Sequence, residues 1–230
     1  MNGWQRLFPR ISLTPIAKSS IGGLQKIRVD AGEGETLLTP LEFAALSGAK
    51  FSPWLEMESE RIHRKICING AKLRKKQRLS LEQLWQGNYY RKEIESAYLP
   101  EVVIRWIDDQ IGWGVFAKRN FKPKEYIAEY TGLVRKWRRS DRKNAYCFEY
   151  VHESGRSTSY LIDARDQAGV ARYINHSATP NLQPTLATIG DVTHVLLLVK
   201  TPIREGDQLC YDYGPAYWAH RQSPISLLRN

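Results

Sequence analysis

The half of the chain that follows residue 98 contains many short β-type segments, and this pattern limits the fold more than any other feature. Residues 102–107 have the β-branched and aromatic content of a strand. Further short runs of this type, separated by Gly, Pro and Asn, lie at about residues 115–117, 126–131, 146–151, 158–163, 192–199 and 207–211. Only residues 164–174 have a helical pattern in this half. Closely spaced short strands predict a compact β-rich domain.

The segment before this half is predicted to be mostly helical. Its start and stop signals place helices at about residues 39–48, 52–70 and 80–97. Thr39 with Glu42, and Ser80 with Gln83, have the spacing of capping boxes at two of these starts. The Asn-Gly pair at 69–70 is interpreted as the end of the second helix.

Together these patterns predict an α+β chain with a boundary near residue 98. Its parts are a mostly helical N-terminal region, a β-rich domain and a C-terminal tail, at residues 1–98, 99–218 and 219–230. The first 35 residues are expected to form short strands and loops. Because the helical segment is small for a hydrophobic core of its own, we expect it to contact either a second copy of the chain, in a homodimer, or the substrate.

Several classes of protein and site are excluded by what the sequence lacks. Cys67, Cys147 and Cys210 are far apart and form no Cys-x-x-Cys, so neither a zinc cluster nor a disulfide framework is expected, and no metal site is predicted. Free thiols of this kind suit a reducing compartment such as the cytoplasm. No run of about 18 apolar residues occurs, and the first residues lack a signal-peptide pattern, so we expect a soluble chain without a membrane span.

Common catalytic motifs are missing too. The sequence has no Gly-x-Ser-x-Gly elbow, no phosphate-binding loop and no His-Glu-x-x-His.

The net charge of +10 is concentrated in two basic runs. The first contains Arg61, Arg64, Lys65, Lys72, Arg74, Lys75, Lys76 and Arg78. The second contains Arg135, Lys136, Arg138, Arg139, Arg142 and Lys143. Each run fits either a solvated helical face or a surface that attracts nucleic acid or an acidic partner, and both interpretations stay open. The first run has no interleaved aromatic residues, which disfavours stacking on single-stranded bases.

Four short segments carry the residues that are suited to chemistry. They are Gly112-Trp113-Gly114, Glu129-Tyr130-Thr131-Gly132, Asn175-His176 and Tyr211-Asp212-Tyr213. Glycines allow a ligand to approach the backbone closely, and the Asn-His pair with nearby phenols suits a polar ligand beside a narrow aromatic channel. Each segment taken alone also has an ordinary structural interpretation, as a hairpin turn or as part of a core.

In this order and at this spacing, the four segments resemble those of the SET-domain protein lysine methyltransferases, over about residues 100–218. The resemblance implies a β-rich SET fold in which residues 175–181 form part of a knot-like crossing with the C-terminal segment. It implies S-adenosylmethionine as cofactor, bound by Gly112, Trp113, Gly114, Tyr130, Arg172, Asn175, His176, Tyr213 and Trp218. It also implies that Tyr213 is the catalytic tyrosine, that Tyr211 limits the number of methyl groups added, and that Tyr146 lines the lysine channel.

The sequence departs from the family near its C-terminus. Ala178 stands where the family commonly has Cys, and no Cys follows Tyr213, so a zinc-bound C-terminal flap is excluded. Trp218 and the tail are therefore expected to close the channel. This compact, cysteine-poor form is similar to bacterial SET proteins, chlamydial ones included. That similarity implies histone or histone-like substrates, and a location in the host nucleus if the chain is a secreted effector.

The resemblance leaves the product and the substrate to be decided. The hydroxyl of Tyr211 predicts mainly mono-methylation, because it leaves less room for a second methyl group. Two alternatives to a histone methyltransferase stay open. One is methylation of a non-histone protein, and the other is a non-catalytic SET-fold module that binds nucleic acid or partner proteins.

Overall fold

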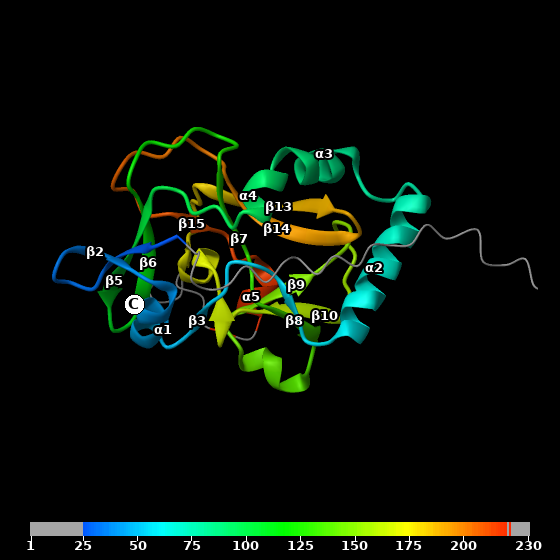
Figure 1. The fold of residues 1–230 in the computed structure, drawn as a ribbon, viewed down its shortest axis with the longest axis horizontal. Coiled ribbons are helices and arrows are strands. Elements are labelled where there is room, and N and C mark those ends of the chain that lie inside the picture. Colours follow the sequence, from blue (N-terminus) through cyan, green and yellow to red (C-terminus); the bar gives the residue numbers. More distant parts are fainter. Residues whose placement is uncertain (1–24, 220, 222–230) are drawn as a thin grey trace, which may run out of the picture.

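Short strands from all parts of the chain surround a shared apolar core (Figure 1). The computed structural model describes residues 25–219 and 221. The first sheet has the strand order β2 (Glu35–Leu38), β1 (Ile27–Asp30), β5 (Val102–Asp108), β6 (Gly112–Ala117). The second has the order β4 (Glu56–Met57), β8 (Leu133–Lys136), β10 (Tyr160–Asp163), β9 (Cys147–Tyr150). The third is β13 (Leu182–Ile189), β14 (Val192–Val199), β7 (Tyr126–Glu129). Two strand pairs complete the set, β11 (Gln167–Ala168) with β3 (Lys50–Phe51), and β12 (Asn175–His176) with β15 (Cys210–Tyr211).

Helices lie around these sheets. They are α1 (Pro40–Ser47), α2 (Glu60–Lys75), α3 (Leu81–Tyr89), α4 (Arg91–Glu95) and α5 (Pro215–Trp218), with 3-10 turns at Arg139–Lys143 and Val170–Tyr173. Helix α3 covers β13 and β14, and α2 flanks the same side of the molecule (Figure 1). None of the helices in residues 25–219 is both long and apolar enough to cross a membrane.

The helix starts that depend on local capping are confirmed. Around Thr39, the hydroxyl accepts a hydrogen bond from the Glu42 amide at 3.3 Å, and the Glu42 carboxylate accepts one from the Thr39 amide at 2.7 Å. Ser80 caps α3 by accepting from the Gln83 amide at 3.0 Å. The capping box predicted at Ser80 is wrong in its second half, because the Gln83 side chain bonds elsewhere: its amide nitrogen donates to the His152 carbonyl oxygen at 2.8 Å and to the Thr188 hydroxyl at 2.6 Å.

The predicted bounds of the second helix are wrong at both ends. Helix α2 begins after Ser59, because the preceding residues pair as β3 and β4 with strands from the other half of the chain. The helix also continues through Gly70 to Lys75. A side chain at Gly70 would place its Cβ 2.1 Å from the carbonyl oxygen of Asp191, so the glycine permits close contact with the β13–β14 hairpin. Packing, not helix termination, accounts for this glycine.

Other predicted elements differ in length or kind. The third helix ends at Tyr89, and a separate short helix, α4, follows it. Residues 164–174 are not an α-helix; they contain strand β11 and a single 3-10 turn, since Gln167 and Ala168 pair with β3. The predicted strands are present, several of them shorter, and the pattern does not predict β13. That strand contains Pro184, which is tolerated because β13 lies at the edge of its sheet and pairs only with β14.

The boundary predicted near residue 98 separates a helix-rich from a strand-rich segment, but the two segments do not fold apart. Strand β1 pairs in parallel with β5, and β4 pairs in parallel with β8. Buried Phe43 and Ile66, from before the boundary, belong to the same apolar cluster as Ile162 and Leu197. The N-terminal helices therefore share the core of this chain, while α1 and α3 leave Leu41, Leu81, Trp85 and Tyr89 exposed, and the expected homodimer stays a prediction.

Replacing Gly70 with Ala is expected to lower the free energy of unfolding by about 1–3 kcal/mol, as overpacking of a tight contact does. In an isolated helix the same change raises stability by about 1 kcal/mol, so the sign of the effect reports on the contact with Asp191. Urea unfolding measures it. Asn69→Ala, at the neighbouring exposed position, is the matched control and should leave stability unchanged or higher. A more stable Gly70→Ala variant would contradict the close packing.

Candidate functional site

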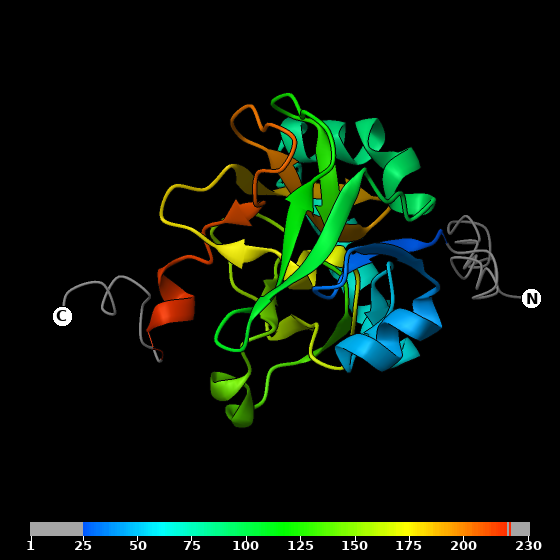
Figure 2. The ribbon, with the colours of Figure 1, turned by 90° about the vertical axis from the view of Figure 1, so that its left-hand side faces the viewer.

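The site forms where two segments far apart in sequence run side by side. Strands β12 and β15 pair in parallel, with Asn175 opposite Cys210 and His176 opposite Tyr211 (Figure 2). Asn181 ties the segments further, because its side chain donates to the Gln208 carbonyl oxygen at 2.8 Å and accepts from the Cys210 amide at 2.9 Å. This crossing brings the Asn-His pair to the tyrosines that the sequence marks out.

The glycine segment reaches the same place through β6. The side-chain amide of Asn175 donates to the backbone carbonyl oxygen of Trp113 at 3.1 Å. Gly112, at the start of β6, has a φ of 76°, a left-handed conformation that favours glycine. The indole of Trp113 packs edge-on against Trp106, with ring centroids 5.3 Å apart. Residues 112–114 and 175–176, predicted to share one ligand, are thus neighbours.

The tyrosines gather on the other side of the Asn-His pair. The Tyr213 hydroxyl donates to the Ile174 carbonyl oxygen at 2.8 Å, and the Tyr213 amide donates to Nδ1 of His176 at 3.2 Å. The rings of Tyr211 and Tyr213 have centroids 4.8 Å apart. Tyr130 is buried close by, and its charge would interact with those of both tyrosines. The structure therefore groups Tyr130 with the phenols.

Burial controls the protonation of this group. Desolvation raises the pKa of Tyr213, and it raises the pKa values of Tyr130 and Tyr211 well above the usual range. The neighbouring phenols act in the same direction, since each disfavours a second negative charge. All three hydroxyls are therefore protonated at neutral pH, and they serve as hydrogen-bonding groups, not as bases.

Tyr146 and Arg172 lie at the rim of this group. Tyr146 is 38% exposed, and its backbone carbonyl oxygen accepts from the Tyr130 hydroxyl at 3.1 Å. The guanidinium of Arg172 stacks over the Tyr146 ring, 4.1 Å from its centroid, while Nε donates to the Ala164 carbonyl oxygen at 2.8 Å. Arg172 therefore packs on the Tyr146 ring and helps to fix its position.

Helix α5 places two further aromatic residues over the site. The Trp218 ring meets the His176 ring edge-on at a centroid distance of 4.8 Å and lies nearly parallel to Tyr213 at 6.3 Å. Tyr217 contacts Tyr213 edge-on at 4.7 Å. The C-terminal segment thus covers the Asn-His pair and the phenols together.

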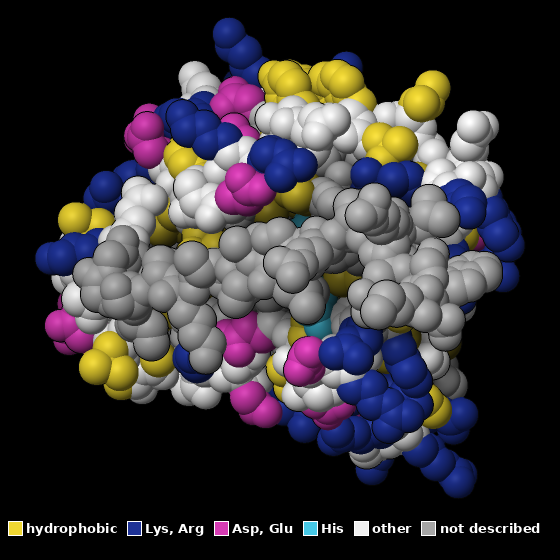
Figure 3. Space-filling model, turned by 45° about the vertical axis from the view of Figure 1, so that its right-hand side comes forward, with side chains coloured by type: hydrophobic (Ala, Val, Ile, Leu, Met, Phe, Trp, Pro, Cys, Tyr) yellow, Lys and Arg dark blue, Asp and Glu magenta, His cyan; other side chains and the backbone are white. Residues whose placement is uncertain are grey.

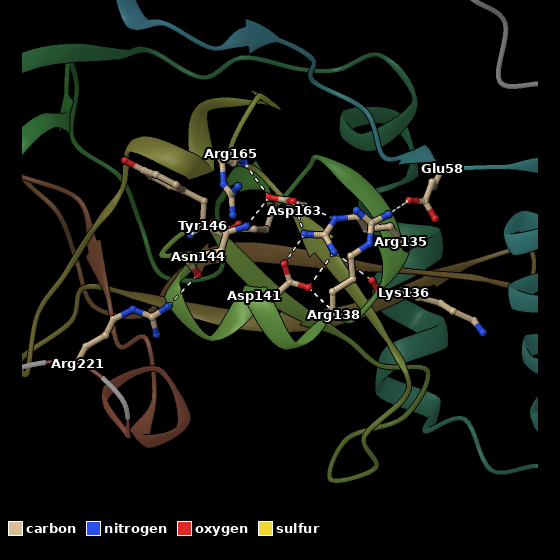
Figure 4. A network of polar contacts seen from close by, with 11 residues as sticks. Glu58, Arg135, Lys136, Arg138, Asp141, Asn144, Tyr146, Asp163, Arg165 and Arg221 are labelled. Atoms are coloured by element: carbon tan, nitrogen blue, oxygen red, sulfur yellow. Dashed lines mark hydrogen bonds and ion pairs between the residues drawn. The ribbon is translucent and has the colours of Figure 1, made fainter.

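Arg221 links α5 to residues 142–144, which we call the wall of the site. No sequence pattern identifies Arg221 as a residue of the site. Its guanidinium donates to the carbonyl oxygen of Asn144 at 2.8 Å (Figure 4), and also to those of Tyr217 at 2.7 Å and Arg142 at 3.2 Å. It also lies 4.3 Å from the centroid of the Tyr217 ring. These acceptors are backbone atoms, which every residue type supplies, so sequence offers no partner to search for.

The wall that receives Arg221 rests on a buried ion-pair network (Figure 4). Arg135 contacts both Asp141 and Asp163 at 2.6 Å, and Asp163 accepts from the Asn144 side chain at 2.8 Å. The hydrogen bonds from Arg135 hold the pKa of Asp141 below its usual range. The placement of Arg135 in a surface run of cations is therefore wrong, because its side chain is buried between two carboxylates.

This network also accounts for the one group of possible metal ligands found in residues 25–219. Asp141, Cys147 and Asp163 have ligand atoms within 4.8 Å of one another. Arg135 already bonds both carboxylates, and burial raises the pKa of the Cys147 thiol to about 12. A protonated thiol beside two neutralised carboxylates is a poor metal site.

An open depression of about 630 Å³ adjoins this wall. Tyr146 lines it, whereas Tyr211 and Tyr213 do not. Charged residues of both signs make up much of its lining, namely Glu58, Arg135, Arg138, Asp141, Lys143, Asp163, Arg165 and Asp166. Tyr146 is thus shared between the buried phenols and a solvent-filled surface groove.

Comparison with known proteins identifies the region that contains the site. The SET domain family matches residues 112–214. Histone-lysine N-methyltransferase Set8 of Drosophila melanogaster is 38% identical over 112 residues, which cover 45% of this chain and 16% of that protein. N-lysine methyltransferase KMT5A-A of Xenopus laevis is 34% identical over 116 residues, covering 45% of this chain and 33% of that protein. The chain thus matches a third or less of the length of these two relatives.

Among solved structures, SUVH6 of Arabidopsis thaliana in complex with SAM is similar with a TM-score of 0.43 and 25% identity. The match covers 49% of this chain and 27% of that chain.

Proposed function

The chain carries a SET domain at residues 112–214, and from this we propose that it is an S-adenosylmethionine-dependent protein-lysine N-methyltransferase. The observation that carries the proposal is the position of Asn175 and His176. These two residues adjoin Trp113 on one side and the phenols Tyr211 and Tyr213 on the other. The relatives named as lysine methyltransferases support the same activity.

The residues around the Asn-His pair suit S-adenosylmethionine. Trp218 and His176 offer flat aromatic surfaces for the adenine ring of the cofactor. Asn175 and the backbone of residues 112–114 offer polar groups for the other end of the cofactor. The faces of Tyr211 and Tyr213 favour a cation such as a sulfonium. When bound, the cofactor supplies a methyl group on positively charged sulfur.

The phenols would prepare the lysine amine for attack. An ammonium has an unperturbed pKa of about 10.4 and must lose a proton before it attacks. Buried aromatic walls disfavour the charged form, so the channel itself promotes that loss. The protonated phenols do not take up the proton, because burial raises their pKa values. Water therefore has to accept it, and the chain mainly aligns the amine.

The hydroxyl of Tyr213 has a further role that follows from its hydrogen bond. Its proton points to the Ile174 carbonyl oxygen at 2.8 Å. The lone pairs of its oxygen are therefore left for weak C–H···O contacts with a polarised methyl group. Such contacts are small individually but directional, and they favour one line of transfer.

For the substrate we propose a histone or a histone-like basic protein, on the basis of the relatives named as histone-lysine methyltransferases. The groove beside Tyr146 is open and lined by charges of both signs, which suits the residues that flank a target lysine. A non-histone protein is the alternative within the same activity. We further propose that Tyr211 restricts the product mainly to the mono-methylated lysine, because its buried hydroxyl occupies space next to Tyr213.

The activity is tested by transfer of labelled methyl groups from S-adenosylmethionine to histones and to whole-cell lysate, with mapping of the modified lysine by mass spectrometry. We expect Tyr213→Phe to bind the cofactor normally by calorimetry but to turn over at least about tenfold more slowly, since the C–H···O contacts of its oxygen, worth about 0.5–1 kcal/mol each, are lost together. Absence of transfer to any protein would overturn the methyltransferase proposal. Loss of cofactor binding in the variant would contradict only the role of Tyr213.

Replacing Tyr211 with Phe is expected to shift the product from mono-methyl towards di- and trimethyl-lysine, because removing the hydroxyl frees space at the amine. Mass spectra of a modified peptide measure the distribution. Tyr126→Phe removes a buried hydroxyl from a separate apolar cluster and should leave the distribution unchanged. Abundant trimethyl-lysine from the unaltered chain would contradict the role of Tyr211.

Replacing Arg221 with Ala is expected to raise KM for the protein substrate roughly fivefold, with a smaller effect on unfolding temperature. The physical reason is that α5 loses its hydrogen bonds to Asn144 and Arg142 and no longer holds Tyr217 and Trp218 over the site. Steady-state kinetics measure the change. Arg204→Ala, at an exposed position, is the control. An unchanged KM would show that this fastening does not shape the channel.

A further inference from the structure

The outer face of α2 carries positive charge almost without compensation. The exposed cations of the helix and of the residues that directly follow it are Arg61, Arg64, Lys65, Lys72, Arg74, Lys75, Lys76 and Arg78. The helix contains one acidic residue, Glu60. Its buried face holds Ile62, Ile66 and Gly70, so the helix is fixed to the core and its cations face solvent.

Most of these cations have no carboxylate partner. Acidic groups neutralise three of them, in the pairs Arg64–Glu60 at 2.9 Å, Arg74–Asp191 at 3.4 Å and Arg78–Glu153 at 2.9 Å. Within the described chain, Arg61, Lys65, Lys72, Lys75 and Lys76 make no ion pair. Residues 1–24, 220 and 222–230 contain no Asp or Glu, so their side chains supply no carboxylate to these five cations.

The five cations form a row along one side of the helix, which we call the α2 row. Arg61, Lys65, Lys72 and Lys75 are separated by whole turns or pairs of turns, and Lys76 extends the row. At 1.5 Å per residue the row, from Arg61 to Lys76, is about 22 Å long. Like charges four residues apart, as in Arg61 with Lys65, destabilise a helix by about 0.2–0.5 kcal/mol each. An anionic partner would relieve this repulsion.

Further exposed cations lie close to the start of the row. Arg138 pairs with Glu58 at 2.6 Å, immediately before the first turn of α2. Lys136, at the end of β8, and Arg139, Arg142 and Lys143, in the 3-10 turn that follows Arg138, are also exposed. Lys and Arg side chains gather along the right-hand and lower edges of this face (Figure 3). We call the α2 row and the exposed cations of residues 136–143 together the basic surface, and the Arg138–Glu58 pair links the two parts.

We propose that this basic surface binds the phosphate backbone of duplex nucleic acid without reading its sequence. A duplex presents about one negative charge per 1.7 Å of axis, so a row of this length meets many phosphates. The α2 row includes no aromatic residue for stacking on unpaired bases, which disfavours a single strand. Ile68 is the one large exposed apolar residue of α2, which is little for the apolar anchors that protein interfaces use.

This binding is independent of the proposed methyl transfer, since α2 lies outside the residues that match the SET domain. Where both hold, the α2 row keeps the enzyme near substrates that are themselves bound to nucleic acid. The surface would then act on the local concentration of substrate, not on the chemistry.

Fluorescence anisotropy of the full chain with a labelled DNA duplex of about 30 base pairs, at several salt concentrations, tests the proposal. A fourfold variant, Lys65→Gln, Lys72→Gln, Lys75→Gln and Lys76→Gln, is expected to bind more than tenfold more weakly at about 0.1 M salt and to show a salt slope smaller by up to about 3.6. The matched control removes four exposed lysines elsewhere, by Lys26→Gln, Lys92→Gln, Lys122→Gln and Lys200→Gln, and should change affinity little. The same titration with a labelled RNA duplex shows whether the chain binds DNA or RNA duplexes with higher affinity.

Three results would overturn the proposal. One is no binding of either duplex at low salt, and another is an equal loss of affinity in the control variant, which would indicate net charge alone. The third is tighter binding of the chain to polyglutamate than to duplexes, which would indicate an acidic protein partner. Methyl transfer to a free peptide should be unchanged in the fourfold lysine variant. This measurement therefore distinguishes a failure of the nucleic-acid proposal from a failure of the proposed methyltransferase activity.

Discussion

The parallel pairing of β12 with β15 is the interaction on which the rest of the site depends. It joins residues 175–176 to residues 210–211, and the side chain of Asn181 bonds the backbone on both sides of the same crossing. Without this pairing His176 would not receive the Tyr213 amide, and Asn175 would not lie between Trp113 and the phenols. One short strand pair and the side-chain hydrogen bonds of Asn181 therefore position groups that come from three distant parts of the chain.

The elements around the crossing serve to hold it. Buried Arg135 binds Asp141 and Asp163 and so fixes the wall next to Tyr146, and Arg221 fastens α5 to the backbone of that wall. From the other side, the N-terminal helices and strands complete the sheets and the core. Breaking a buried charge pair of this kind is costly because the remaining charge stays desolvated. The wall is accordingly held by buried ion pairs, while α5 is held by the hydrogen bonds of Arg221 and by the aromatic contacts of Tyr217 and Trp218.

Sequence predicts those features that local chemistry specifies. A helix N-cap and the residue types that favour a strand are local features, so the Thr39 cap and the strand at 102–108 are found where the pattern places them. Gly70 and Pro184 are misleading for the opposite reason. Each has a meaning set by a distant contact, with Asp191 for the glycine and with an open sheet edge for the proline. Arg221 has no signal at all, because its partners are backbone carbonyls.

By itself the sequence determined the α+β class, the similarity of residues 112–214 to the SET domain family and the residue types of the site, because those depend on motif order and on the chemistry of Asn, His and Tyr. Only the tertiary structure decided how these residues are used. In the structure Tyr130 and Arg172 lie beside the phenols. Arg135, which the sequence pattern assigns to a surface run, is buried in an ion-pair network, whereas the cations of the α2 row face solvent. The physical reason is that burial and pairing are properties of neighbours in space, which spacing along the chain does not encode.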